Sequence, residues 1–256
     1  MIELREIEAA RARIADVALR TPLVRLHAAE VPAGTDIYLK LEALQPIGSF
    51  KIRGATNAVR TAPEKARRAG LVTVSAGNMA QGVAWAGREL GLSATIAVPD
   101  HAPQGKHDAI VIPFGGGGLT VGIASAVRAL RPEVRVYTAE PATGAALAAA
   151  LPAGEPVDVE YTASFVDGSG SRRVLDSMWP RVQPLVDGAF TVPIADAAAA
   201  VRTLAGRARV VAEGAGALAL AAALAGRAGT GKVVCIVSGG NINLGKLSEI
   251  LQGGDS

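Results

Sequence analysis

The sequence predicts an α/β fold in which a largely parallel sheet carries helices on its faces. Short runs rich in Val and Ile alternate with longer Ala-rich stretches along most of the 256 residues. This alternation is typical of strands joined by crossover helices. The helical stretches are also apolar enough to pack against a sheet, as a parallel sheet requires. Glycine or polar residues follow several of the strands, at the edge where such folds bind ligands.

Each expected element follows from its own pattern. Residues Leu4–Leu19 place Ile and Ala at helical spacing among Glu and Arg, which predicts an amphipathic helix. An extended segment (TPLVRL), a strand at Ile37–Leu44 and a helix from Phe50 to about Thr61 come next. Further strands are expected at VTVS, ATIAVP, AIVIPF, VRVYTAE and KVVCIVS. Further helices are expected at Met79–Leu90, Leu119–Leu130, Ala142–Leu151, Asp196–Ala205 and Gly216–Ala225.

Composition narrows the classes of function. The net charge is +3, the basic residues are scattered among acids, and only four Phe, three Tyr and two Trp are present, so no nucleic acid is expected as a partner. A single cysteine, Cys235, excludes an internal disulfide and a cysteine-built metal site. The first twenty residues lack the apolar stretch of a secretory signal, and no apolar run is long enough to span a membrane. A cytoplasmic enzyme with no membrane contact is expected.

Two segments near one another in the sequence favour a chemical site. Lys51 opens a helix directly after Gly48 and Ser49, and the helix dipole and partial burial there lower a lysine pKa and favour the neutral amine that forms a Schiff base. Taken alone, such a lysine is more often a solvated surface residue. The segment Ser75-Ala76-Gly77-Asn78 falls between a strand and a helix, where backbone N–H groups bind anions, although the same residues also suit a simple N-cap.

Two later segments also place glycine or polar residues directly after an apolar strand. Gly115-Gly116-Gly117-Gly118 stands between an apolar strand and an apolar helix, so consecutive N–H groups and a helix dipole can cradle a phosphate. No Gly-Lys-Ser/Thr follows, which excludes a nucleotide P-loop. Ser238 follows the strand KVVCIV, where a hydroxyl points into the crevice at the sheet edge.

In their order along the chain, these segments resemble the fold-type II pyridoxal-phosphate enzymes, specifically the threonine/serine dehydratase and serine racemase family. The resemblance extends through most of the chain and includes SAGNMAQGVAWAG, VPDHAPQGK, VIPFGGGGLTVGIASAVRAL, YTASFVDG, VVAEGAGALAL and VVCIVSGGNIN. Several colinear segments are far more specific than any one of them. The fold it implies is the tryptophan synthase β-like one, with a second lobe.

The resemblance implies pyridoxal 5′-phosphate as cofactor and assigns a role to each segment. Lys51 would hold the cofactor as a Schiff base beside Phe50, Asn78 would bond the ring 3′-oxygen, and Ser238 would face the pyridine nitrogen. The glycine run would cradle the phosphate, and Gly168 and Glu213 match positions near the cofactor. The implied cofactor-binding set is Phe50, Lys51, Asn78, Gly115, Gly116, Gly117, Gly118, Gly168, Glu213 and Ser238, and the implied substrate-carboxylate set is Ser75, Ala76, Gly77 and Asn78.

The implied reaction removes water and ammonia from L-threonine or L-serine, and Lys51 takes the α-proton as general base. An amino-acid racemase is the alternative within this chemistry, with Ser75 as the second acid/base. A non-catalytic pyridoxal-phosphate protein is the alternative outside it. The substrate is expected to be a small hydroxy amino acid, and a homodimer is one expectation for the assembly.

The sequence departs from the family pattern in three places. Only HAPQGKHD separates Asp100 from Ala109, where the family has further strands and helices. We therefore expect a truncated small domain (46–108) beside a large cofactor domain (1–45 and 109–256). Since a lid protects reactive intermediates, cofactor binding should survive this deletion better than turnover. Met79 stands where the family usually has His. Glu140 lacks a second acid at Ala146, so no bound metal is expected.

Overall fold

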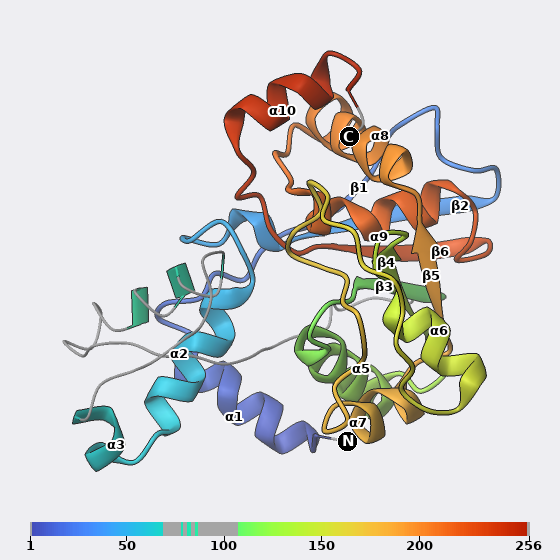
Figure 1. Ribbon diagram of the computed structural model, residues 1–256. Coiled ribbons are helices and arrows are strands. Elements are labelled where there is room, and N and C mark those ends of the chain that lie inside the picture. The colour runs from blue at the N-terminus through green and yellow to red at the C-terminus, as the bar shows by residue number, and fades with distance from the viewer. Residues whose placement is uncertain (1, 69–77, 79–80, 83–84, 87–106, 255–256) are drawn as a thin grey trace.

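The computed structural model describes residues 2–68, 78, 81–82, 85–86 and 107–254, and within them one six-stranded sheet organises the chain (Figure 1). The strands lie in the order β1-β2-β6-β3-β4-β5. Four neighbouring pairs are parallel, and β1 pairs with β2 in the antiparallel sense. The largely parallel α/β sheet predicted from the sequence is therefore confirmed. The strands are β1 (Leu23–Arg25), β2 (Thr35–Leu41), β3 (Ala109–Pro113), β4 (Arg135–Pro141), β5 (Gly188–Val192) and β6 (Gly231–Val237).

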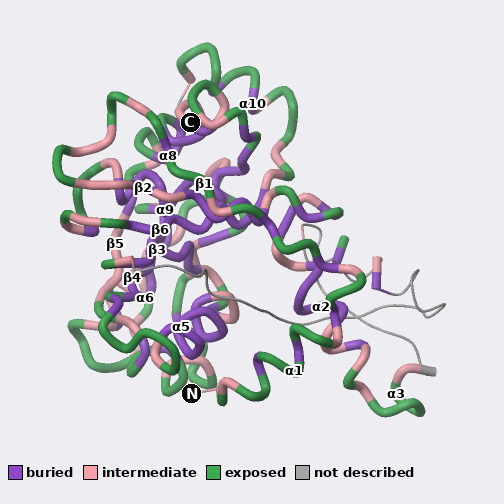
Figure 2. Tube along the Cα trace, turned by 180° about the vertical axis from the view of Figure 1, so that it is seen from behind, coloured by how far each residue is buried: buried purple, intermediate pink, exposed green. Residues whose placement is uncertain are grey.

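Helices cover both faces of this sheet. One face packs against α8 (Ile194–Thr203), α9 (Gly214–Leu224) and α10 (Leu244–Leu251), and the other against α5 (Gly118–Leu130), α6 (Ala146–Ala153) and α7 (Trp179–Val182). The alternation of side chains along each strand divides the core into these two layers. Val111 and Cys235 belong to the α9 layer, whereas Ile110 and Val234 belong to the α5 layer. In Figure 2 the central strand β3, most of β6 and α9 are buried.

The N-terminal helices lie to one side of the sheet. Helix α1 (Leu4–Ile14) contacts both α2 (Lys51–Thr61) and α5, and α3 (Glu64–Arg68) follows α2 (Figure 1). The amphipathic pattern of α1 buries Ile7, Ala10 and Ile14. Helix α2 begins directly after a loop that is bridged to the residues following β6. This bridge places the start of α2 at the carboxyl edge of the parallel strands.

Several predicted boundaries are corrected by the structure. The strand expected at Ile37–Leu44 ends at Leu41, and a 3-10 turn (Glu42–Leu44) follows it. The helix expected from Ala142 begins at Ala146, because the chain turns sharply after β4. Strand β5 was not predicted, since GAFTV is short and only half buried at the sheet edge, and neither were α3, α7 and α10. The strands VTVS and ATIAVP and most of the helix from Met79 lie outside the described residues. Among the described helices, none combines the length and the hydropathy that crossing a bilayer demands.

Candidate active site

The candidate site is a cavity of about 220 Å³ at the carboxyl edge of the sheet. It lies between the start of α2, the loop that joins β3 to α5, and the loop that follows β6. These are the three segments in which the sequence places a reactive lysine, a glycine run and a hydroxyl. Fourteen described residues line the cavity: Phe50, Lys51, Gly54, Pro113, Gly115, Gly116, Gly117, Gly118, Leu119, Thr120, Gly168, Met178, Ala215 and Ser238.

Lys51 is the first residue of α2 and lines this cavity. The backbone N–H of the preceding Phe50 donates a hydrogen bond to the carbonyl of Ser238 over 3.0 Å, and this bond joins the two loops. The Lys51 ammonium nitrogen lies 5.2 Å from the centre of the Phe50 ring. The start of α2 is therefore held against the loop after β6, and its lysine faces the cavity.

The glycine run lines the same cavity. Gly117 has φ +80°, a backbone conformation that side chains disfavour, and its alanine Cβ would lie 2.6 Å from the Met178 side chain. This turn directs the N-terminus of the 13-residue helix α5 at the cavity. A Cβ on Gly116 would meet no atom within 4 Å, so this position opens onto free space. Unpaired N–H groups and the helix dipole favour an anion there.

A short segment after residue 165 forms another wall. The Ser169 hydroxyl and the Gly170 N–H both donate hydrogen bonds to the carbonyl of Phe114, at the end of β3. Gly168 is thereby held beside Gly115: a Cβ on Gly115 would lie 3.3 Å from the carbonyl oxygen of Gly168. Gly168, which the resemblance placed near the cofactor, thus lines the same cavity as the glycine run.

Asn78 and Glu213, which are both predicted site residues, bond directly to each other. The Asn78 amide nitrogen lies 2.7 and 2.9 Å from the two carboxylate oxygens of Glu213. The amide nitrogen of Asn241 donates to the Asn78 oxygen and also to the Ile47 carbonyl. Asn241 therefore orients the Asn78 amide, whose NH₂ points to Glu213. The sequence motif Ser238-Gly239-Gly240-Asn241 includes this asparagine, but only Ser238 was assigned a role from the sequence.

Burial and charge set the protonation of two of these groups. Desolvation lowers the pKa of Lys51 below its ordinary value, and the attraction of the Glu213 carboxylate opposes this shift. Desolvation also raises the pKa of Glu213, against the hydrogen bond from Asn78. The Lys51 amine is consequently easier to deprotonate than a surface lysine, which suits a nucleophile or base.

The structure brings together nearly all the described residues that the sequence singled out. Lys51, Phe50, the four glycines, Gly168 and Ser238 line one cavity, and Glu213 and Asn78 lie beside it. Ser75, Ala76 and Gly77 lie outside the described residues. Thr120 and Met178 also line the cavity and were not predicted. A threonine directly after a glycine run offered a signal for Thr120, whereas nothing in the local sequence pointed to Met178.

The Glu140 carboxylate is bonded to the start of a helix. Its buried carboxylate accepts hydrogen bonds from the backbone N–H groups of Leu147 and Ala148, over 3.0 and 2.8 Å, and so caps α6. Desolvation raises its pKa to about 7, despite these donors. Within the described part of the chain, no three His, Cys, Asp or Glu side chains gather in a way that could hold a metal ion.

The cavity fits a small phosphorylated aldehyde. An aldehyde needs an amine of lowered pKa, which Lys51 provides, and a phosphate needs a helix N-terminus, which α5 provides in the same cavity. The Thr120 hydroxyl lies in the first turn of α5, lines the cavity, and is buried without a hydrogen-bond partner among the described residues. A phosphate oxygen there would accept a hydrogen bond from this hydroxyl. Pyridoxal 5′-phosphate combines both functional groups in one molecule.

Comparisons with known proteins agree with this geometry. The L-threonine ammonia-lyase of Thermotoga maritima is 32% identical over 317 aligned residues, which cover 99% of this chain and 79% of that protein. The structure of maize serine racemase has a TM-score of 0.85 at 28% identity and covers 98% of each chain. The crystal structure of a threonine deaminase from T.th. has a TM-score of 0.84 at 30% identity and covers 94% of this chain and 99% of that one.

One family model matches most of the chain in two segments. Residues 14–110 and 104–239 match the family described as pyridoxal-phosphate dependent enzyme. The segments meet at 104–110, where the sequence predicted an internal deletion. The alignment to the Thermotoga maritima protein is longer than the whole chain, so at least 61 of its positions have no counterpart here. The chain belongs to the family of pyridoxal-phosphate-dependent enzymes.

Proposed function

We propose that this protein is a threonine/serine ammonia-lyase that converts a small hydroxy amino acid to a 2-oxo acid and ammonia. The observation that carries the proposal is one cavity that is lined both by Lys51 and by the N-terminal turn of α5. Relatives named L-threonine ammonia-lyase match 92% and 99% of this chain at 31% and 32% identity.

Each described residue has a task in this reaction. Lys51 would hold the cofactor through its amine, and its lowered pKa suits that amine to take the α-proton of the substrate. The glycine run and Thr120 bind the phosphate at the start of α5. Ser238 lines the cavity and would offer the ring nitrogen a hydroxyl rather than a carboxylate. The bound cofactor supplies the electron sink for β-elimination.

The remaining predictions about site and assembly belong to this proposal. Ser75, Ala76 and Gly77 would bind the substrate carboxylate, and Asn78 would orient the ring. The large domain would comprise residues 1–45 and 109–256, with a truncated small domain at 46–108. The enzyme would act in the cytoplasm, and a homodimer is expected. Turnover should suffer more than cofactor binding, because a shortened small domain shields the site less from water.

The test combines a spectrum with an assay. Purified protein loaded with pyridoxal 5′-phosphate should show a visible absorbance band, and threonine should then yield 2-oxobutanoate. Lys51→Ala should lose both the band and the product, whereas Lys65→Ala, at an exposed position of α3, should keep them. A band that persists in Lys51→Ala would remove the basis of the proposal. A band without turnover in the wild type would indicate a cofactor-binding protein that has lost its activity.

The phosphate end can be tested separately. A methyl group on Gly116 meets nothing within 4 Å in the cofactor-free cavity, so Gly116→Ala should leave the fold intact. The same methyl group would crowd a phosphate at the start of α5, and we expect cofactor affinity to fall at least tenfold, about 1.4 kcal/mol. Spectroscopic titration measures this affinity. Unchanged affinity would place the phosphate elsewhere.

A racemase is the second candidate, favoured by the similarity to maize serine racemase. Both reactions begin with removal of the α-proton, but racemisation needs a second acid/base on the opposite side of the substrate, for which Ser75 is the candidate. Chiral chromatography of L-serine after incubation separates the two. D-serine without pyruvate would favour the racemase, and pyruvate without D-serine the lyase.

A further inference from the structure

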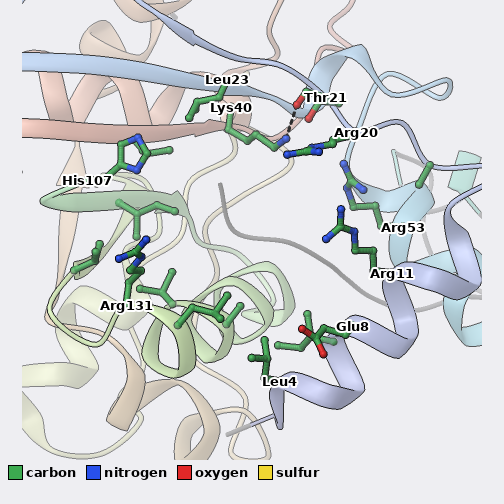
Figure 3. A pocket seen from close by; sticks show the side chains of 18 of the residues that line it. Leu4, Glu8, Arg11, Arg20, Thr21, Leu23, Lys40, Arg53, His107 and Arg131 are labelled. Carbon is green, nitrogen blue, oxygen red and sulfur yellow. Dashed lines mark hydrogen bonds between the residues drawn. The ribbon is translucent and has the colours of Figure 1, made fainter. Parts of the chain in front are cut away.

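A second and larger cavity lies on the opposite face of the sheet from α9. It has a volume of about 1000 Å³ and extends between α1 and α5 (Figure 3). Ile110 of β3 and Val234 of β6 contribute its floor, and Ile7 and Val127 contribute its walls. Lining residues run the whole length of α1, which is about 16 Å at about 1.5 Å per residue, so the groove is long enough for three turns of another helix.

The edges of this groove carry positive charge. Arg11 and Arg20 stand on one side and Arg131 on the other, and Glu8 is the one acidic residue among the described residues that line it (Figure 3). Lys40 and Arg53 also reach the groove, where Arg53 forms a buried ion pair with Glu42 at 2.7 Å. An apolar floor between basic edges is complementary to a helix with an apolar stripe and acidic flanks.

The groove also lies where relatives of this chain have additional residues. The two family segments meet at 104–110, and His107 and Ile110 line the groove. At least 61 positions of the Thermotoga maritima relative have no counterpart in this chain. The extra residues of relatives therefore leave the common fold at the edge of this groove. Parallel sheets are normally covered by helices on both faces, and no helix among the described residues covers β3 and β6 between α1 and α5.

We propose that this groove binds an acidic amphipathic helix of another polypeptide, at the place where relatives carry additional residues of their own. The occupant contributes an apolar stripe against β3, β6 and the facing sides of α1 and α5. Its acidic flanks pair with the arginines at the edges. The bound helix would restore the helical layer over this part of the sheet.

Binding of a designed peptide tests the proposal. The probe is a fluorescent helical peptide of about 11 residues, roughly three turns, with leucines on one face and glutamates on its flanks. A second peptide has lysine in place of each glutamate. We expect saturable anisotropy with the acidic peptide and at least tenfold weaker binding of the basic one. No binding, or equal binding of both peptides, would overturn the proposal.

Two matched variants locate the binding site. Leu130 is 53% exposed and lines the groove, whereas Leu175 is 62% exposed and is not among the residues that line it. Both substitutions are at exposed positions, so the fold should tolerate them. Leu130→Arg should weaken binding of the acidic peptide at least tenfold, and Leu175→Arg should leave it unchanged. An equal loss in both variants, or in neither, would contradict the proposed site.

Two further measurements complete the design. Insertion of the unmatched Thermotoga maritima residues between Lys106 and His107 should cover the groove and abolish peptide binding, and a chimaera that binds as tightly as the wild type would argue against the proposal. Sedimentation would show whether a second copy occupies the groove: a wild-type dimer that Leu130→Arg converts to a monomer would overturn it. None of these measurements requires cofactor or substrate, so their outcome is independent of the proposed activity.

Discussion

Gly216 is the position at which a single methyl group should disturb the candidate site most directly. It lies in the first turn of α9, and its alanine Cβ would be 2.3 Å from the carbonyl oxygen of Gly239. That oxygen accepts the backbone N–H of Glu213 over 3.1 Å. Ordinary contact begins near 3.4 Å. Gly216→Ala must therefore push the loop after β6 away by about 1 Å, and this motion breaks the bond to Glu213.

The magnitude follows from three contributions. Overpacking of a buried contact costs about 1–3 kcal/mol. A buried hydrogen bond left unmade costs about 1–3 kcal/mol. Alanine in place of glycine in a helix returns up to about 1 kcal/mol. The free energy of unfolding should fall by about 3 kcal/mol in Gly216→Ala, and cofactor affinity should fall with it, because the displaced loop carries Ser238.

Urea unfolding of the cofactor-free protein measures the stability, and spectroscopic titration measures the cofactor affinity. Gly206→Ala is the matched control, since it is an exposed position in a helical segment and its Cβ would meet nothing within 4 Å. We expect the control to change the free energy of unfolding by less than about 1 kcal/mol. A Gly216→Ala protein as stable as the wild type would refute the argument that this close approach fixes the site.

Three further outcomes are expected. Glu42→Ala leaves Arg53 buried without its carboxylate, so the free energy of unfolding in urea should fall by about 3–5 kcal/mol. The control Asp36→Ala removes a more exposed ion pair and should lower it by less than about 1 kcal/mol. Equal losses of stability in the two variants would contradict this prediction. The pKa of Glu140 is raised from 4.5 to about 7 by burial, so its contribution is fully present below pH 4.5 and is lost as the pH rises through 7. The free energy of unfolding should fall by up to about 3 kcal/mol across this window, and Glu140→Gln should lack this part of the pH dependence. Burial raises the pKa of the Cys235 thiol, which should react with a disulfide reagent only after unfolding; rapid labelling of the native protein would show that the strand is accessible.

Local sequence patterns predicted much of the fold. Alternation along each strand and the Ala-rich helical stretches depend only on residues near in sequence, so β3, β4, β6, α5 and α9 could be predicted from the sequence with small errors at their ends. Lys51 and the glycine run were recognisable for the same reason. Each owes its chemistry to a neighbouring helix start.

The tertiary structure decided how these pieces meet. The bond between Asn78 and Glu213 joins residues 135 positions apart, and Asn241 orients it from a third segment. Such contacts depend on the order in which strands join the sheet, which short-range patterns do not contain. The sequence shows that residues are missing before Ala109, but only the packing of α1 and α5 shows that a groove is left there. Side chains become neighbours through long-range packing, whereas helices and strands are set by the spacing of residues along the chain.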